Sequence, residues 1–278
     1  MRARKFIAGA WVDAAALVVI GVVFVVPFVF IVLTAAKTRP EAALFEFSWP
    51  SHFQLLQNIR DVVTYGDHRM ALAMWNSTLL TLGSVTLIVL LSALVAFVMQ
   101  RRHDRMASLV SSVMLAGLII PPSVVPTIFL LQRIGLYKTL LGLIMVEVAY
   151  TMPFATLIFR AFMGSIPSEI DESAILDGAS PLRVFFSIIL PLLQPAIITV
   201  IITSAVGIYN DFTGPLYFLP GAQNVTAQLT LFTFISQFSS QWNLLFADVV
   251  VITLPPLIMF LLFQRQIVEG MTAGAIKG

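Results

Sequence analysis

Two apolar stretches of this 278-residue sequence carry polar side chains that could bind a solute. Glu147 and Tyr150 lie inside one stretch, and Asn210 and Asp211 end another. Polar groups are costly in hydrocarbon and by default mark a solute path or a contact between helices. We expect all four residues to line a path, where Glu147 can hydrogen-bond to hydroxyl groups. Two alternatives stay open: an interhelical contact for Glu147, and interfacial water for Asn210 and Asp211.

The sequence holds no pattern that favours catalysis, metal binding or nucleotide binding. It has no Cys, which excludes disulfides, thiolate nucleophiles and Cys-ligated metals. His52, His68 and His103 lie between the apolar stretches without the spacing of metal ligands, and none can complete a catalytic triad inside a stretch. The phosphate loop Gly-x-x-x-x-Gly-Lys-Ser/Thr does not occur. We therefore expect no catalytic residue, metal or cofactor, and any energy from ATP must come through another polypeptide.

The composition indicates that lipid is the main solvent of this chain. Its residues are 59% hydrophobic and 11% charged, whereas soluble domains have about 45–50% apolar and about 25% charged residues. The formal net charge is only +2, and the basic residues are scattered along the chain. Nothing in this distribution indicates binding to nucleic acid.

The apolar stretches are long enough to cross a bilayer as helices. A helix needs about 20 residues to span a hydrocarbon core of about 30 Å. Six runs qualify, at residues 14–34, 72–98, 106–131, 140–162, 192–212 and 247–263. The first run exceeds the apolar part of a secretory signal, which has about 7–15 residues. The sequence thus predicts an all-α membrane protein, in which residues 1–278 form one transmembrane domain of six helices.

Basic residues predict that both termini lie in the cytoplasm. One cluster precedes the first run and another follows the second: Arg2, Arg4, Lys5, Arg101, Arg102 and Arg105. The positive-inside rule sends such clusters to the cytoplasm. Residues 214–246 hold no Lys or Arg, which suits an outer loop. Residues 37–69 are discordant with four basic residues, but four acidic residues accompany them.

Two further local features have structural consequences. Prolines interrupt the third, fourth and sixth runs at Pro121, Pro122, Pro126, Pro153, Pro255 and Pro256. Because proline removes a backbone donor, we expect kinked helices, either around an enclosed path or as ordinary bends. Asn76, Ser77 and Thr78 open the second run, where we expect them to cap its helix.

Residues 166–191, on the predicted cytoplasmic side, indicate two short helices with a sharp turn between them. Ser168 can cap the first helix, with Asp171 as its capping-box partner. Gly178 can end that helix, because glycine adopts the left-handed conformation at low cost. Ser180 and Pro181 can start the second helix, which should run to Pro191. We predict a rigid projection toward the cytoplasm.

The same segment resembles the EAA loop of ABC importer permeases. The shared pattern is Glu, two small residues, three of any kind, Gly, nine more and Ile-x-Leu-Pro. It is filled by Glu172, Ser173, Ala174, Gly178, Ile188, Leu190 and Pro191, with Asp177 before the glycine. Ser173 stands where the family usually has Ala. In that family the loop is the coupling helix that docks into a groove on the ATPase subunit, so the resemblance implies the same role for these eight residues.

Two other segments resemble carbohydrate permeases of the maltose type. The tail, residues 264–278, resembles theirs, which reaches the interface between two ATPase subunits; this implies ATPase contacts for Thr272, Ala273, Gly274 and Lys277. The sequence Tyr-Asn-Asp-Phe at residues 209–212 resembles their Trp-Asn-Asp/Glu-Phe, with Tyr209 replacing Trp.

The resemblance implies a fold, a function and a set of partners. The fold would be the type I-like transmembrane domain of ABC importers, in the bacterial cytoplasmic (inner) membrane. The chain would be a non-catalytic permease subunit that translocates a mono- or oligosaccharide by alternating access. Its partners would be a second homologous permease, two ATPase subunits, an extracytoplasmic solute-binding protein and membrane lipid. Two alternatives are an ABC permease for a non-sugar solute and a secondary transporter driven by an ion gradient.

Overall fold

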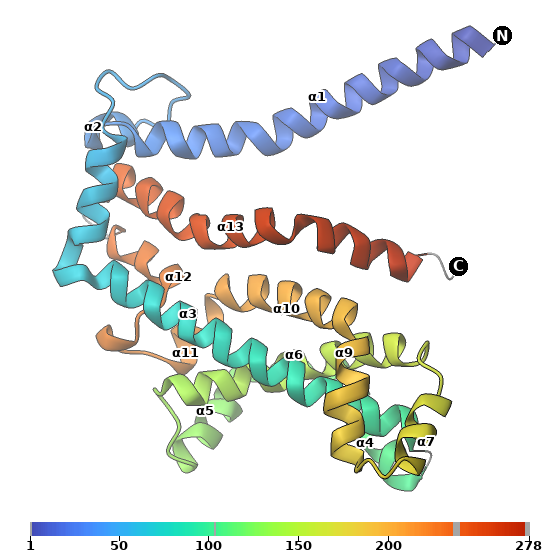
Figure 1. Ribbon diagram of the computed structural model, residues 1–278. Coiled ribbons are helices and arrows are strands. Elements are labelled where there is room, and N and C mark those ends of the chain that lie inside the picture. Colours follow the sequence, from blue (N-terminus) through green and yellow to red (C-terminus); the bar gives the residue numbers. More distant parts are fainter. Residues whose placement is uncertain (1, 103, 236–239, 276–278) are drawn as a thin grey trace. The chain divides into compact units, whose positions relative to one another are not determined.

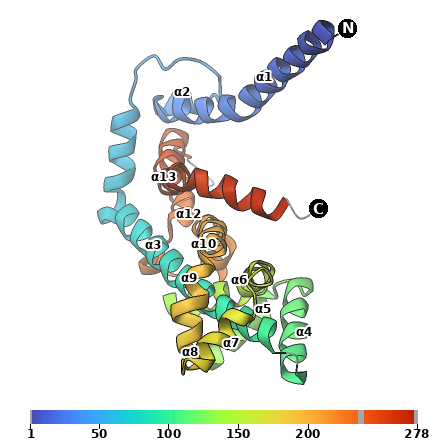
Figure 2. The same cartoon turned by 45° about the vertical axis from the view of Figure 1, so that its right-hand side comes forward.

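The computed structural model describes residues 2–102, 104–235 and 240–275, and their side chains over residues 16–66, 68–102, 104–235 and 240–264. Over these residues every regular element is a helix (Figures 1 and 2). The helices form two compact units, which we describe separately. Unit 1 comprises Met1–Ala71 and Thr230–Leu254, and unit 2 comprises Leu72–Leu229 and Pro255–Gly278. The predicted all-α fold class is confirmed.

The helices are labelled in Figures 1 and 2. They are α1 (Arg2–Ala35), α2 (Arg39–Ala42), α3 (Leu55–Arg101), α4 (Arg105–Ile119), α5 (Val124–Arg133), α6 (Leu140–Met163), α7 (Glu169–Leu176), α8 (Pro181–Val184), α9 (Leu190–Leu192), α10 (Gln194–Tyr209), α11 (Thr213–Phe218), α12 (Ala227–Thr230) and α13 (Trp242–Ala275). A π-helical segment, η1 (Phe185–Ile189), joins α8 to α9, and short 3₁₀ turns flank α12.

Among the described residues, fewer helices than the six predicted are by themselves long and apolar enough to cross a bilayer. Among the described residues, four helical segments are long and apolar enough: Ala16–Ala35, His68–Arg101, Leu140–Met163 and Trp242–Gln264. Pro181–Leu192 and Gln194–Tyr209 make a fifth if this pair, bent by 77°, counts as one span. The predicted span at residues 106–131 is divided between α4 and α5. The six-span arrangement is therefore not confirmed and stays a prediction.

Prolines explain only one of the expected interruptions. Residues 120–123, which include Pro121 and Pro122, separate α4 from α5. Pro121 and Pro122 remove two backbone donors in succession, which weakens a helix at this point. By contrast, α6 continues through Pro153, and α13 continues through Pro255 and Pro256.

The predicted capping role of Asn76, Ser77 and Thr78 is wrong. Helix α3 begins at Leu55, so these residues lie in its interior. The Nδ2 atom of Asn76 donates to the carbonyl oxygens of residues 223 and 225 at 3.1 and 2.9 Å. The Oγ atom of Ser77 accepts from the amide of Ala227 at 2.9 Å. Their polar groups therefore hold the segment before α12 against α3, a tertiary role that local spacing does not reveal.

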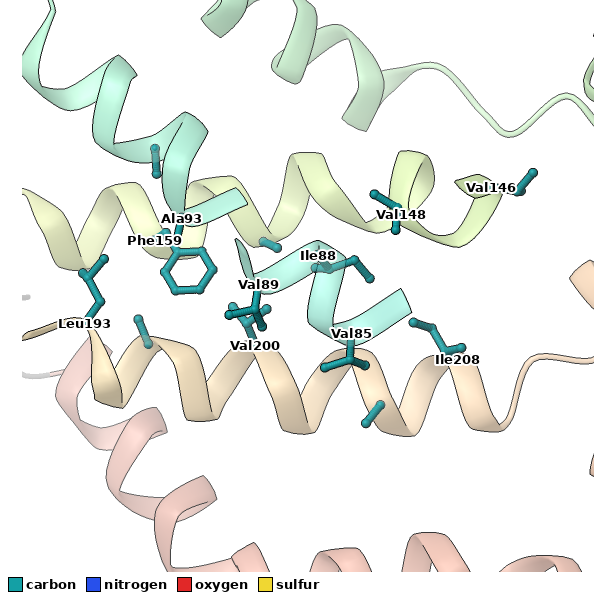
Figure 3. Packing of buried hydrophobic residues seen from close by; sticks show 14 of the residues in the cluster. Val85, Ile88, Val89, Ala93, Val146, Val148, Phe159, Leu193, Val200 and Ile208 are labelled. Atoms are coloured by element: carbon teal, nitrogen blue, oxygen red, sulfur yellow. The ribbon is translucent and has the colours of Figure 1, made fainter. Parts of the chain in front are cut away.

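Unit 2 has a continuous apolar core around α6. Helix α6 packs against α4, α10 and α11, and Figure 3 shows Val89, Phe159 and Val200 converging from three helices. Phe159 and Phe185 are fully buried. Where lipid replaces water around the helices, van der Waals contacts between close-packed side chains stabilise such a core. This core gives the segments around it fixed positions.

Unit 1 holds buried polar groups. Lys37 is 1% exposed, and its Nζ atom donates to the carbonyl oxygen of Glu46 at 2.6 Å. Asn58 donates to the carbonyl oxygens of Ala35 and Lys37 at 2.8 and 3.0 Å, and accepts from Asn243 at 2.9 Å. Lys37, one of the four basic residues in 37–69, thus serves internal packing.

Candidate functional site

The turn at Gly178 has the geometry that the sequence predicts. Helix α7 ends in a Schellman motif, in which the amide of Ala179 donates to the carbonyl of Ala174 and the amide of Gly178 donates to that of Ile175, both at 3.0 Å. Gly178 has a φ of +86°, a value that L side chains rarely adopt. The Oγ atom of Ser180 then accepts from the amide of Arg183 at 3.4 Å, with Pro181 in the first turn of α8. We call residues 166–193 the knob.

The knob is attached to the end of α3 by an ion pair. The Nε atom of Arg101 donates to Oδ2 of Asp171, and its Nη2 atom donates to the carbonyl of Ile166 at 3.1 Å. The side chains of Arg101 and Asp171 are 17% and 9% exposed. The predicted capping box is wrong, because the Ser168 side chain makes no capping hydrogen bond and Asp171 is engaged by Arg101. Arg101, 70 residues away in the sequence, takes the Asp171 carboxylate that the capping box would need. The spacing of Ser168 and Asp171 cannot reveal such a distant partner.

The tip of the knob exposes large apolar side chains. Leu176 is 87% exposed, Leu182 62% and Ile175 55%. Of the eight predicted coupling residues, Glu172, Ser173, Asp177 and Gly178 are exposed, Ala174 is buried, Ile188 and Leu190 are half-buried, and Pro191 is exposed. Exposed apolar side chains beside carboxylates suit a protein partner better than free solvent.

The second helix of the knob continues one residue further than the sequence predicts. It runs through α8, η1 and α9 to Leu192, and Pro191 lies within α9. Leu193 then separates it from α10, at a bend of 77°. Val184, Phe185, Ile189 and Leu193 are buried along this path. The knob and α10 are therefore packed on one core but point in different directions.

Three of the four predicted path residues lie together in one pocket. Glu147, Tyr150 and Asp211 line a cavity of about 320 Å³. The remaining lining residues are Pro122, Val124, Val146, Gly207, Thr213, Gly214 and Phe218. Both charged groups that line it are carboxyl groups. Carboxyl and phenol groups on apolar walls can hydrogen-bond to an uncharged polar solute.

Asp211 shapes this pocket through the start of α11. Its Oδ1 and Oδ2 atoms accept from the amides of Thr213 and Gly214 at 3.0 and 2.7 Å. Glu147, on α6, is 8% exposed. Asn210 lies outside the pocket lining, and its Oδ1 atom accepts from Gln228 at 3.2 Å. Asn210 is thus the one predicted path residue that the structure does not bring to the pocket.

Gly214 is a pocket residue that sequence reasoning missed. A Cβ atom at this position would lie 3.0 Å from Oε1 of Glu147, 3.2 Å from a methyl group of Leu143, and closer still to Asp211. Glycine is therefore required where α11 passes the two carboxyl groups. The sequence feature that could have indicated this close packing is a glycine, Gly214, three residues after Asp211 at the start of a helix.

We expect Gly214→Ala to destabilise the chain by about 1–3 kcal/mol, because the added methyl group overpacks the pocket. Thermal unfolding in detergent measures this change. Gly207→Ala is the matched control, since a Cβ there meets no atom within 4 Å; it should leave stability unchanged or raise it by up to about 1 kcal/mol through helix propensity. Equal effects of the two variants would contradict the packing described for Gly214.

The C-terminal tail is only partly described. Thr272, Ala273 and Gly274 continue α13, which extends to Ala275, and Lys277 lies outside the described residues. Within the described residues no group of three or more His, Cys, Asp or Glu side chains could hold a metal ion.

Bilayer-length apolar helices, an exposed rigid knob and a polar pocket are features that suit a membrane transport subunit. The chain belongs to the family described as binding-protein-dependent transport system inner membrane component, whose model matches residues 88–272. The matched region contains the knob, the pocket and the core between them. Members of this family are permease subunits of ABC importers, which work with ATPase and solute-binding partners.

Curated relatives match nearly the whole chain. The diacetylchitobiose uptake system permease protein NgcG of Streptomyces coelicolor is 30% identical over 278 residues, which cover 99% of this chain and 90% of that protein. The probable starch degradation products transport system permease protein AmyC of Thermoanaerobacterium thermosulfurigenes is 28% identical, covering 94% of each.

A solved structure shares the fold. It is the crystal structure of a bacterial ABC transporter involved in the import of the acidic polysaccharide alginate. The TM-score is 0.82 over 94% of this chain and 97% of the other, at 16% identity. This likeness confirms the predicted ABC permease fold.

Proposed function

We propose that this chain translocates a sugar across the bacterial cytoplasmic membrane as one half of a permease pair. Related permeases named for diacetylchitobiose, starch products and melibiose support the substrate class. A second, similar permease completes the pathway, and a solute-binding protein delivers the sugar from outside. Both termini and the knob lie in the cytoplasm, as the basic clusters before residue 14 and after residue 98 favour.

The observation that carries the proposal is the knob. A turn with a left-handed glycine, exposed Ile175, Leu176 and Leu182 at its tip, and an ion pair at its base make a rigid surface for a partner. Two ATPase subunits hydrolyse ATP, and one of them docks here on Glu172, Ser173, Asp177 and Gly178. The tail at Thr272, Ala273, Gly274 and Lys277 gives a second ATPase contact. Closure of the ATPases moves the knob, and the packed core carries that movement to the pocket.

The pocket provides the substrate contacts in this proposal. Glu147 and Asp211 accept hydrogen bonds from sugar hydroxyl groups, and Tyr150 offers both a hydroxyl and an aromatic face. Asn210 directly precedes Asp211 in the sequence and lies outside the pocket lining, where it extends the polar path beyond the pocket. The apolar walls, such as Phe218, can pack against the faces of sugar rings.

Uptake by the assembled transporter tests the proposal. Proteoliposomes that contain this chain, its partner permease, the ATPase subunits and the binding protein should accumulate radiolabelled sugar only when ATP is supplied. Accumulation should persist when an uncoupler removes the proton gradient. Uptake that needs the gradient and ignores ATP would instead support an ion-driven transporter that uses buried carboxylates such as Glu147 and Asp248. Uptake restricted to non-sugar solutes would refute the substrate class.

A further inference from the structure

A second polar cavity, of about 400 Å³, lies at the other end of α6 from Glu147. It is lined by the end of α3, the first turns of α4 and one side chain of α6: Met99, Gln100, Arg102, Asp104, Ala107, Ser108, Ser111, Ser112 and Arg160. We call it the serine–arginine pocket. It shares no lining residue with the pocket at Glu147, and no part of the proposed transport function uses it.

The charges in the serine–arginine pocket do not balance. Asp104 accepts from Nη2 and Nε of Arg102 at 2.5 and 3.0 Å. A hydrogen bond from the amide of Ala107, together with the Arg102 side chain, lowers the pKa of Asp104, so this carboxylate stays ionised beside Arg102. Arg160 has no carboxylate within ion-pair distance in the described part of the chain. One positive charge is left over.

Arg160 is also poorly supplied with hydrogen-bond acceptors. A guanidinium has five N–H donors. The one side-chain acceptor recorded for Arg160 is Oγ of Ser111, at the long distance of 3.3 Å. Ser108 and Ser111 line the cavity beside it, and their hydroxyl groups can donate to an anion, whereas the hydroxyl of Ser112 already donates to the carbonyl oxygen of Ser108 at 3.0 Å. A guanidinium with free donors beside two such hydroxyl groups matches a phosphate group.

The position along α6 indicates where that phosphate comes from. Arg160 lies three residues before the end of α6, or about 4.5 Å along the helix axis. That places its charge at the depth of lipid headgroups.

We propose that the serine–arginine pocket binds the phosphodiester of an anionic phospholipid, with Arg160 as the principal ligand. An anionic headgroup neutralises the single surplus charge, whereas a zwitterionic headgroup brings its own cation into a pocket that already holds Arg102. The assignment to the cytoplasmic leaflet rests on the orientation proposed above. The binding itself does not depend on that orientation.

Native mass spectrometry of the full chain in detergent tests this site, with equal amounts of phosphatidylglycerol and phosphatidylcholine as probes. The wild type should retain phosphatidylglycerol with a preference of about tenfold, as expected for a charge-assisted hydrogen bond. Arg160→Gln should bring the two lipids near parity. Arg133→Gln removes a charge from an exposed position at the end of α5, outside the pocket, and should keep the preference.

A second pair of variants covers the case in which Arg160→Gln does not fold. Ser112 is exposed at the pocket, so Ser112→Trp should fill the cavity and abolish the preference, while Ser112→Ala should keep it. Circular dichroism checks the helical content of each. A wild type without preference, or a preference that survives both Arg160→Gln and Ser112→Trp, overturns the proposal. Complete displacement of phosphatidylglycerol by excess inorganic phosphate assigns the pocket to free phosphate and also overturns it. None of these readouts involves transport, so their failure leaves the proposed function standing.

Discussion

Replacing Gly178 by Trp is expected to abolish ATP-driven sugar uptake while leaving the chain folded. A Cβ atom at Gly178 would meet no heavy atom within 4 Å, so the indole projects freely from the knob into the surface proposed for ATPase docking. The left-handed φ of +86° adds a strain of about 1–2 kcal/mol. A bulky group at the centre of an interface costs more than about 2 kcal/mol of binding, so ATPase affinity should fall more than tenfold. Co-purification of the ATPase and proteoliposome uptake measure the two effects.

A matched glycine separates docking from strain in this experiment. Gly135, between α5 and α6, has a φ of +73° and equally open space around its Cβ position. Gly135→Trp should therefore lower thermal stability as much as Gly178→Trp does, yet leave ATPase co-purification intact. Gly178→Ala carries the strain without the bulk and should retain most uptake. Normal uptake by Gly178→Trp would refute the docking role of the knob.

Breaking the ion pair at the base of the knob is expected to uncouple ATP hydrolysis from uptake. Arg101→Ala leaves Asp171 as a buried carboxylate without its cation, and Oδ1 of Asp171 already lacks a hydrogen-bond partner. Loss of one member of a buried pair costs about 3–5 kcal/mol. The side chain of Arg101 is 17% exposed, and contact with solvent weakens an ion pair, so we expect a smaller destabilisation of roughly 2–3 kcal/mol. Thermal unfolding measures this change. A knob that is no longer fixed to α3 can still bind the ATPase but moves α10 less effectively.

Two further variants isolate the pair itself. Asp171→Ala and the double variant Arg101→Ala, Asp171→Ala complete a thermodynamic cycle, in which the double variant should cost less than the sum of the single ones. Arg105 is a nearby exposed residue that forms no ion pair within the described part of the chain. Arg105→Ala should therefore preserve both stability and coupling. Additive effects in the cycle would show that Arg101 and Asp171 do not act together.

Local chemistry made parts of this structure predictable. Gly178, Ser180 and Pro181 form the turn that their types require, because a left-handed glycine and a proline in the first helical turn depend on backbone geometry within a few residues. Glu147, Tyr150 and Asp211 were also brought to one pocket, since polar groups in apolar helices avoid lipid.

Tertiary contacts account for the predictions that were wrong. Asp171 pairs with Arg101, 70 residues away, and not with Ser168. Asn76 serves the backbone of residues 223 and 225, about 150 positions later in the chain. No pattern within one segment reports such partners. Helix α3 starts at Leu55, whereas the sequence predicts a span from residue 72. The difference arises because a hydropathy criterion finds only the part of a helix that suits lipid.

The bend after the knob determines which displacement α10 receives. The axes of Pro181–Leu192 and Gln194–Tyr209 differ by 77°, close to a right angle. A push along the first segment therefore has almost no component along α10, and acts on its near end as a sideways force. The π-helical turn at Phe185–Ile189 interrupts the α-helical hydrogen-bond pattern within the first segment. We therefore expect a push on the knob to move α10, the helix that ends beside Asp211, mainly sideways.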